Sequence, residues 1–448
     1  MDIMLILQII VFLGAIFFGI RLGGIGIGYA GGVGVVVLGL CLGMPPGQIP
    51  WDVILIIMSV IAAISAMQLS GGLDYLVFLA EKLLRKNPKQ INYLAPAITY
   101  FLTILAGTGH TAFSLIPVIV EVAREQNIKP SVPLSISVVS SQIAITASPV
   151  GAAVITMTGL LEPLGWSYPV LLLIWIPTTF IGCMVTAFII SRIYALDLDK
   201  DPVYLERLQK GLIEPPIGAQ NMQIKKGAKL SVLIFVLGIA CIVIYATAIS
   251  KVGGKAILIE NVVVGRDAAI MSFMLSIATL ITLFCKIEPA KIADTSVFKN
   301  GMVACVCVLG VAWLGNTFVG GHTDQITSLS QSFVQAYPAS LAFILFFVSM
   351  LLYSQAATAK AVMPVVIAAL GITTANPHDS YIVIASFAAV SGLFVLPTYP
   401  TTLGAIGMDY TGTTRGGKYI FNHSFFLPGV LSIAISVALG FVITPIFA

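Results

Sequence analysis

The chain has 448 residues, of which 58% are hydrophobic and only 9% are charged, and its formal net charge is +4. A soluble domain carries about 25% charged residues, so this composition, together with a mean hydropathy of +1.02, excludes an ordinary soluble protein. We predict an all-α polytopic membrane protein that contacts the lipid bilayer along its length and has no nucleic-acid partner.

Three apolar segments open the chain, each long enough for a helix that crosses a bilayer. The N-terminal segment lacks a basic region and a small-residue cleavage site, so we interpret it as a first helix that is retained. The second segment carries glycines at four-residue spacing, which allows close packing between membrane helices. The predicted spans are 4–20, 25–43 and 53–70, and the glycine pairs are Gly24/Gly28, Gly28/Gly32 and Gly39/Gly43.

A polar interruption lies inside the next apolar stretch, residues 91–123. The sequence AGTGHTAFSLIP, residues 106–117, brings glycines, hydroxyl groups and a histidine into it. About 15 residues precede this motif, or roughly 22 Å of helix, which is short of a bilayer core of about 30 Å. We therefore predict a re-entrant hairpin whose tip lies at mid-depth, where non-helical backbone is tolerated only inside protein or beside a wet cavity.

A broken span and a final span complete the first half. The broken span, 132–161, is interrupted at Ser-Pro-Val-Gly, and the final span is 168–190. Residues 191–228 are rich in charge and proline, so we predict a solvated cytoplasmic linker there. The domains are then an N-terminal repeat, 1–190, and a C-terminal repeat, 229–448.

The second half repeats this plan. Its sequence SQAATAKAVMPV can be laid over GTGHTAFSLIPV, which pairs Thr358 with Thr111 and Pro364 with Pro117. The breaks in the two broken spans fall at nearly the same offset. The predicted elements are spans at 229–248, 268–285 and 300–320, a hairpin at 338–374, a broken span at 380–405 and a final span at 424–446.

The distribution of basic residues predicts the orientation of the chain. If neither hairpin crosses the membrane, each half has five spans, one of them discontinuous, and an odd number inverts the second half relative to the first. With both termini outside, in the periplasm, most Lys and Arg residues fall in cytoplasmic loops, as the positive-inside rule requires, whereas Lys251, Lys255 and Arg266 fall outside. We therefore predict two inverted-topology repeats.

Inverted repeats with discontinuous helices place substrate sites at mid-membrane, where helix N-termini direct positive dipole ends at anions. We predict that the two hairpin tips and the two breaks converge there; kinks needed only for packing are the alternative. Lys360, a costly charge at this depth, is the predicted counter-ion, with snorkelling as its alternative. The candidate substrate-binding residues are Gly107, Thr108, Gly109, His110, Thr111, Ser148, Pro149, Ser354, Gln355, Thr358, Lys360, Pro397, Thr398 and Thr401.

Two further groups of polar residues are candidates for an access path or a second tier. Asn316 and Thr317 lie near the outer end of a span, where capping a helix is the alternative role. Glu81 and Arg85 stand four apart and can form an ion pair, with a solvated cytoplasmic face as the alternative. The sequence shows no spaced cluster of metal ligands and no nucleophile constellation, and its six cysteines lie in or beside apolar runs. No metal, cofactor, catalytic residue or disulfide is predicted, so the chain is not expected to be an enzyme.

Several long motifs resemble those of a known family. They are RLGGIGIGYAGG, IMSVIAAISAMQLSGGLDYL, AEKLLRKNPKQINYLAPAITYFLTILAGTGHT, SQIAITASPVGAAV, GVAWLGNTFV and LFVLPTYPTTLGAI, and they extend over essentially the whole chain. Together they closely resemble the anaerobic C4-dicarboxylate transporter (Dcu) family. The resemblance implies an antiporter of the bacterial inner membrane that takes up fumarate, malate or aspartate in exchange for succinate, largely during anaerobic growth.

The broader ion-transporter superfamily that the chain resembles implies an elevator mechanism. Both hairpins and both broken spans would form the moving transport domain, and the other helices would form a scaffold through which a homo-oligomer assembles. Related carriers bind sodium at Ser-Asn-Thr tips, a motif that the breaks ASPV and LPTYPTT of this chain depart from. Some family members also associate with a membrane sensor kinase, which the resemblance adds as a partner.

Three other functions stay open at this stage. Proton- or sodium-coupled uptake of aspartate or another small organic anion would use the same fold. An intramembrane enzyme would need a nucleophile–base pair or metal ligands at depth, for which His110 is the available side chain. A receptor or co-sensor would use the 191–228 loop as its partner surface.

Overall fold

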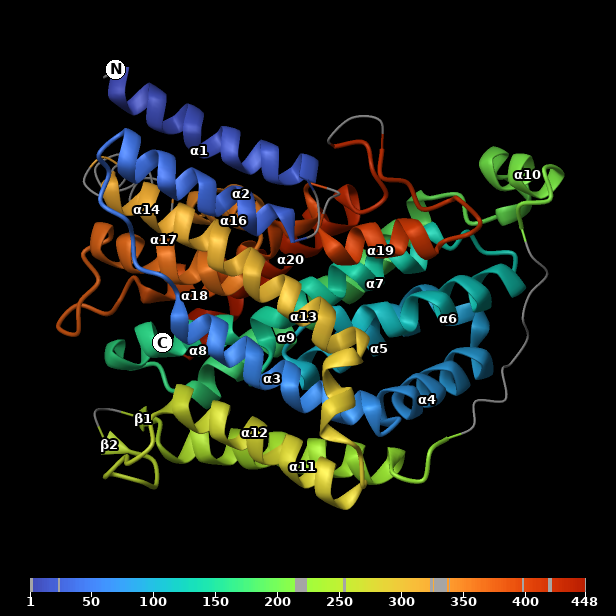
Figure 1. The fold of residues 1–448 in the computed structure, drawn as a ribbon, viewed down its shortest axis with the longest axis horizontal. Coiled ribbons are helices and arrows are strands. Elements are labelled where there is room, and N and C mark those ends of the chain that lie inside the picture. The colour runs from blue at the N-terminus through green and yellow to red at the C-terminus, as the bar shows by residue number, and fades with distance from the viewer. Residues whose placement is uncertain are drawn as a thin grey trace.

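The computed structural model describes residues 3–22, 25–213, 224–252, 255–322, 325, 337, 339–396, 399–417 and 421–447. Within these ranges the protein is helical apart from one short antiparallel ribbon, β1 (Lys251–Val252) and β2 (Lys255–Ala256). The long helices run roughly parallel between two ends of the molecule (Figure 1). One end carries the start of helix α1 and the ribbon, and the opposite end carries helix α10.

In the first half of the chain, helices form wherever the sequence is continuously apolar, and they end at the predicted interruptions. The bounds are α1 (Ile3–Leu22), α2 (Gly26–Val36), the π-helix η1 (Val37–Cys41), α3 (Trp51–Leu69), α4 (Gly72–Lys86), the 3₁₀ turn η2 (Pro88–Gln90), α5 (Ile91–Ala106), η3 (Gly109–Thr111), α6 (Ala112–Glu125), α7 (Ser131–Ala144), η4 (Ile145–Ala147), α8 (Ala152–Leu161), η5 (Glu162–Leu164) and α9 (Tyr168–Ile193).

The rest of the chain follows the same plan after a short connecting helix. The connection holds η6 (Leu198–Lys200) and α10 (Pro202–Gln209). The second half holds α11 (Ala228–Ala248), α12 (Arg266–Phe284), η7 (Pro289–Asp294), α13 (Ser296–Cys307), the π-helix η8 (Val308–Ala312), α14 (Trp313–Gly321), α16 (Ser340–Leu352), α17 (Gln355–Ala369), α18 (Ser380–Ser386), the 3₁₀ segment η9 (Phe387–Phe394), α19 (Pro400–Met408), α20 (Phe426–Ile443) and η10 (Thr444–Ile446).

Seven segments among the described residues are long and apolar enough to cross a membrane. The other predicted crossings coincide with shorter apolar helices, α1, α2 with η1, and α18 with η9. The protein is therefore an all-α, multi-pass membrane protein. The seven segments are Trp51–Leu69, Ser131–Leu164, Tyr168–Ile193, Ala228–Ala248, Arg266–Phe284, Ser296–Gly321 and Phe426–Ile446.

Both predicted hairpins coincide with pairs of half-helices, α5–α6 and α16–α17. The first arm of each ends at a residue with left-handed backbone, Gly107 with φ +66° and Tyr353 with φ +54°. This conformation closes a helix, and a bulky residue adopts it only where its surroundings hold it there. Arg85, just before α5, binds Glu125 in the last turn of α6 at 2.6 Å. The start of α5 and the end of α6 therefore lie at the same end of the molecule.

Corresponding elements of the two halves make corresponding contacts. Helix α5 packs on α7, just as α16 packs on η9. The second arm of each hairpin contacts the broken span of the other half: α6 contacts α19, and α17 contacts α8. The last spans, α9 and α20, pack on each other. Around this interlocked set, α1 and α2 form one flank of the molecule, and α11 and α12 form the opposite flank (Figure 1).

Part of the predicted linker is docked on the body rather than solvated along its length. Residues 196–201 contact the α6–α7 connection: the Lys129 N–H donates to Leu196 O (2.7 Å), and the Lys129 ammonium binds the Asp201 carboxylate (3.1 Å). Burial acts to raise the pKa of Asp201, but hydrogen bonds from Lys129 and from backbone N–H groups of α10 outweigh it and hold that pKa below its ordinary value. Residues 214–223 lie outside the described residues.

Candidate functional site

The two hairpin tips and the two breaks line one cavity of about 100 Å³. A water molecule needs only about 10–15 Å³, so the cavity has room for several waters or part of a small ligand. The tips contribute residues 107–109 and 353–356, and the breaks contribute residues within 145–153 together with Tyr399 and Pro400. Four interruptions that are far apart in the sequence therefore meet at one place.

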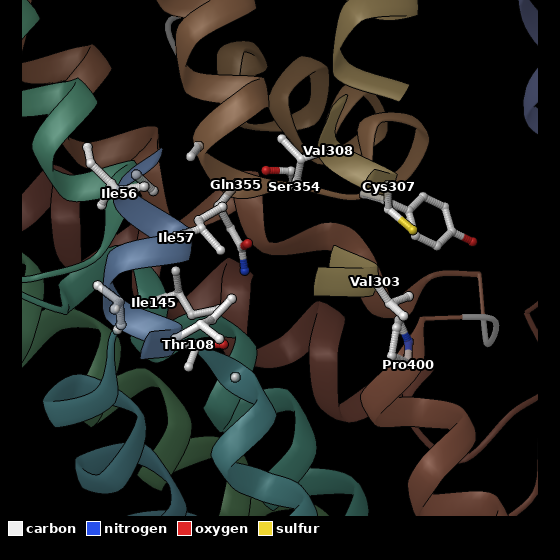
Figure 2. Close-up of a pocket in the computed structure, with 18 of the residues that line it drawn as sticks. Ile56, Ile57, Thr108, Ile145, Val303, Cys307, Val308, Ser354, Gln355 and Pro400 are labelled. Carbon is white, nitrogen blue, oxygen red and sulfur yellow. The ribbon is translucent and has the colours of Figure 1, made fainter. Parts of the chain in front are cut away.

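The opposite wall of the cavity comes from the flanking helices. Ile56 and Ile57 of α3 lie on one side, and Val303 and Cys307 of α13 lie on the other, with the Gln355 side chain directed between them (Figure 2). The cavity thus lies between the interlocked half-helices and helices outside that set. Relative movement of the two groups would change its shape.

The electrostatic character of the cavity is set mainly by helix ends. Helices α8, α17 and α19 begin at Ala152, Gln355 and Pro400, and all three residues are in the wall. No charged side chain is among the described residues that line the cavity. Helix N-termini carry partial positive charge and N–H donors, whereas the C-caps of α5 and α16, Gly107 and Tyr353, bring carbonyl ends to the same wall. The three N-termini are the part of the wall that can attract an anion.

Hydrogen bonds between the second tip and the broken spans fix the shape of this wall. Ser354 caps α17 by accepting from a backbone N–H of its first turn (3.2 Å), and Thr358 Oγ1 donates back to Ser354 O (2.7 Å). Gln355 Nε2 donates to Gln142 O, and Gln142 Nε2 donates to Thr401 Oγ1, both at 3.0 Å. Gln142 therefore ties α17 to α19 from its position on α7.

The first tip is held in a similar way. Ser148 Oγ donates to a carbonyl of α5 (2.6 Å), and Pro149 O accepts from the Tyr168 hydroxyl (2.8 Å). Thr111 Oγ1 donates to Thr108 O (3.2 Å). These groups are engaged in hydrogen bonds within the protein, and they position the tip and the break.

The structure divides the predicted substrate-binding residues into three sets. The cavity wall contains Gly107, Thr108, Gly109, Ser354 and Gln355. A supporting set beside it contains Thr111, Ser148, Pro149, Thr358 and Thr401, which are not in the wall. The His110 side chain, Pro397 and Thr398 lie outside the described residues.

Lys360, the predicted counter-ion, is not in the cavity wall either. Its ammonium forms an ion pair with the carboxylate of Asp52, in the first turn of α3. Ala356, one helical turn before Lys360, does line the cavity. The lysine therefore lies just beyond the cavity, within reach of its edge.

Asn316 and Thr317 hold a loop instead of lining the cavity. Asn316 Nδ2 donates to Gln48 O (2.8 Å), and Thr317 Oγ1 accepts from Gly47 N (3.0 Å). A Cβ atom on Gly47 would overlap the backbone of Asn316. Both residues thus anchor the α2–α3 connection on α14.

Glu81 and Arg85 form the expected ion pair, with Arg85 Nε 2.7 Å from Glu81 Oε1. Arg85 also binds Glu125 (2.6 Å) and lies 3.9 Å from Glu121, both on α6. Burial acts to lower the pKa of Arg85, but hydrogen bonds to Glu125 and Glu81 raise it above its ordinary value. The group connects α4 to the base of the first hairpin and is remote from the cavity.

Replacing Gly107 by alanine is expected to slow the transport that the sequence predicts for this site about 5- to 30-fold, because the left-handed backbone costs an L-residue roughly 1–2 kcal/mol. The new Cβ would also lie 3.0 Å from Val150 Cγ2 and 3.2 Å from Val150 O, across the cavity wall. Gly159→Ala on α8 is the matched control, since a Cβ there meets nothing within 4 Å. Flux assays in proteoliposomes measure the effect; equal rates for the two variants would contradict the assigned tip geometry.

Comparisons with known proteins identify the family. A family model described as "Anaerobic c4-dicarboxylate membrane transporter" matches residues 4–448. The chain belongs to this family. It is 63% identical to "C4-dicarboxylate transporter DcuA" of Helicobacter pylori over 98% of both chains. It is also 53% identical to the protein of that name in Escherichia coli, over 98% of this chain and 99% of the relative, and 37% identical to "Anaerobic C4-dicarboxylate transporter DcuB" of that species, over 98% of both.

Membership of this family makes the protein a C4-dicarboxylate transporter rather than an enzyme.

Several cavity residues escaped prediction from the sequence. Tyr353 directly precedes the second predicted tip, and Tyr399 lies within the predicted break between Pro397 and Thr401, so their positions at the interruptions were the available signal. The isoleucines of α3 gave none, because a helix that is apolar all round does not reveal which side faces a cavity.

Proposed function

We propose that the protein exchanges C4-dicarboxylates across the bacterial inner membrane, taking up fumarate, malate or aspartate and releasing succinate. The observation that carries this proposal is the convergence of three helix N-termini on one cavity. A four-carbon diacid has a carboxylate at each end, and helix termini supply positive potential and N–H donors without a buried cation in the wall. Exchange of fumarate or malate for succinate, one dianion for another, is electroneutral and needs no nucleotide; aspartate, with a net charge of about −1 at neutral pH, would exchange with the movement of one charge.

In the proposed site, the two tips grip the substrate. Thr108 and the Ser354 hydroxyl supply polar contacts from the wall, and Lys360 neutralises one carboxylate from the edge. Gln355, whose Nε2 donates to Gln142 O, fixes the shape of the wall. The hydroxyls of the supporting set keep the half-helix ends in place. Gln142 Oε1, which is buried and has no hydrogen-bond partner among the described residues, belongs to the same support.

An elevator movement is the proposed route across the membrane. The two hairpins and the two broken spans move as one body, and α3 and α13 remain with the scaffold, so the cavity between them opens to alternate sides. The corresponding contacts of the two halves support inverted repeats. Both termini lie in the periplasm in this proposal, which agrees with α1 starting at the end of the molecule opposite α10 (Figure 1).

Counterflow in proteoliposomes tests the proposal. Vesicles are loaded with succinate, labelled fumarate is offered outside, and uptake is measured with and without sodium and with and without internal succinate. We expect uptake that needs internal dicarboxylate and is unaffected by sodium. Uptake into vesicles without internal substrate, driven by a proton or sodium gradient, would replace exchange with ion-coupled uptake of aspartate or another small organic anion.

A further inference from the structure

The ion pair between Lys360 and Asp52 joins the two groups of helices that flank the cavity. Lys360 lies on α17, in the second hairpin, and Asp52 lies in the first turn of α3. Ala356 and Ile56 stand four residues from them and both line the cavity. Residues four apart share one face of a helix, so the pair lies one helical turn, about 5 Å, beyond the cavity wall.

The Lys360 ammonium can turn either way from this position. Side chains on a helix lean towards its N-terminus, and the N-terminus of α17 is the hairpin tip, so Lys360 leans back towards the cavity. Its charge is carried on a flexible four-carbon stem. A substrate carboxylate at the tip and the carboxylate of Asp52 can therefore each bind this ammonium, and binding of one excludes the other.

We propose that Asp52 is a tethered competitor of the substrate: its carboxylate binds Lys360 when no dicarboxylate does, and holds the second hairpin against α3 until a substrate carboxylate displaces it. A carrier without substrate is then restrained, and a loaded carrier is free to move. The pair thereby contributes to the coupling of movement to loading on which exchange depends. This inference rests on the proposed exchange function.

The exposure of the pair suits a contact that must be released. The Lys360 side chain is 31% exposed and that of Asp52 is 41% exposed. Ion pairs open to water shift an equilibrium by at most about fivefold, whereas a buried pair would resist displacement. A dicarboxylate that also meets the helix N-termini can displace Asp52.

Asp267 provides a matched control. It lies in the first turn of α12 and interacts electrostatically with both Asp52 and Lys360, whereas the recorded ion pair of Lys360 is with Asp52. Neutralising either carboxylate removes the same charge from the same region. Only the Asp52 variant removes the competitor, so the difference between them separates competition from general attraction of an anion.

The first experiment measures succinate binding to the purified protein in detergent by titration calorimetry. Asp52→Asn should bind succinate about two- to fivefold more tightly than the unaltered chain, because the binding-competent lysine is no longer occupied. In Asp267→Asn the fold-change in succinate affinity should be less than half of the fold-change in Asp52→Asn. Equal gains in the two variants, or no gain in Asp52→Asn, overturn the proposal. Asp52→Ser repeats the measurement if the Asn variant does not fold.

The second experiment measures efflux of labelled succinate from proteoliposomes whose membrane potential is clamped with potassium and valinomycin. Efflux into buffer without dicarboxylate requires return of the carrier without substrate; efflux into fumarate does not. The ratio of the first rate to the second should rise about two- to fivefold in Asp52→Asn and stay unchanged in Asp267→Asn. An unchanged ratio in Asp52→Asn would contradict the proposal that the ion pair restrains the carrier without substrate.

Failure of the exchange function gives a different result. If the unaltered chain releases succinate equally fast with and without external fumarate, the exchange function and the coupling of movement to loading are wrong. The binding experiment still decides whether Asp52 competes with the substrate, because it involves no transport.

Discussion

Replacement of Lys360 by alanine is expected to reduce fumarate–succinate exchange by about 10- to 100-fold, because a hydrogen bond to a charged group is worth roughly 1.5–3 kcal/mol. The helix N-termini in the cavity wall would remain and would still attract a dianion, so some exchange should persist. The measurement is the initial rate of labelled fumarate uptake into succinate-loaded proteoliposomes. Normal transport by Lys360→Ala would mean that the lysine serves the scaffold contact alone.

Two further variants make this result interpretable. Lys360→Arg keeps the positive charge but replaces a compact ammonium by a planar fork, so it should show intermediate exchange. Lys255→Ala removes the same charge from the exposed ribbon strand β2 and should leave exchange unchanged. Thermal unfolding of each purified variant shows whether a lost activity reflects a lost fold. Asp52 would lose its partner in Lys360→Ala, but its partial exposure to water limits the cost.

Local sequence features were sufficient to locate the apolar spans and their interruptions, but not the amphipathic helix α4 (Gly72–Lys86), which no predicted element covers. Continuous apolar runs and Gly/Pro interruptions act within a few residues, so the spans and the tips could be predicted within a few positions. The contact between Lys360 and Asp52 could not, because it joins α17 to α3 across most of the chain. No pattern around Asp52 distinguishes it from an ordinary acidic residue in the first turn of a helix.

The docked part of the linker shows a different limit. Charge and proline predicted solvation, yet the Asp201-Pro202 step is also a helix start, with the aspartate as N-cap and proline at the first helical position. Asp201 does accept from Val203 N (3.0 Å) and Tyr204 N (3.3 Å). The cap was readable from the sequence. The surface on which α10 docks depends on residues near Lys129 and Tyr410, which are distant along the chain.

The prediction of close packing through the glycines of α2 is correct at Gly28 and wrong by one residue at Gly32. Close packing of this helix was expected at Gly28 and Gly32. Gly28 does meet another backbone, but its companion is Gly31, and a Cβ on Gly32 meets nothing within 4 Å. The partner surface is the π-helix η8, around Gly310. The sequence spacing identified the helix, while the face was decided by a partner that the spacing does not specify.

Gly310→Ala is expected to destabilise the protein by about 3 kcal/mol, the upper part of the range for an overpacked site. Its Cβ would overlap the carbonyl oxygen of Gly28, and the atoms in conflict belong to the α2 backbone, which cannot rotate away as a side chain can. Helices α2 and α13 would have to separate, and the contacts between them would weaken. Without solvent-driven burial between membrane helices, such close packing supplies much of their association.

The midpoint of thermal unfolding should therefore fall by about 3 °C in Gly310→Ala, because an unfolding entropy of about 2.1 cal/mol/K per residue over 448 residues makes 1 kcal/mol worth about 1 °C. Gly320→Ala is the control, because it lies on the adjoining helix α14 and its Cβ would meet nothing within 4 Å; its midpoint should not fall and should rise by about 1 °C. Alanine favours a helix over glycine by about 1 kcal/mol, so a purely local effect would raise both midpoints. A fall confined to Gly310→Ala isolates the contact with α2, and a rise in both variants would show that the two helices can part at little cost.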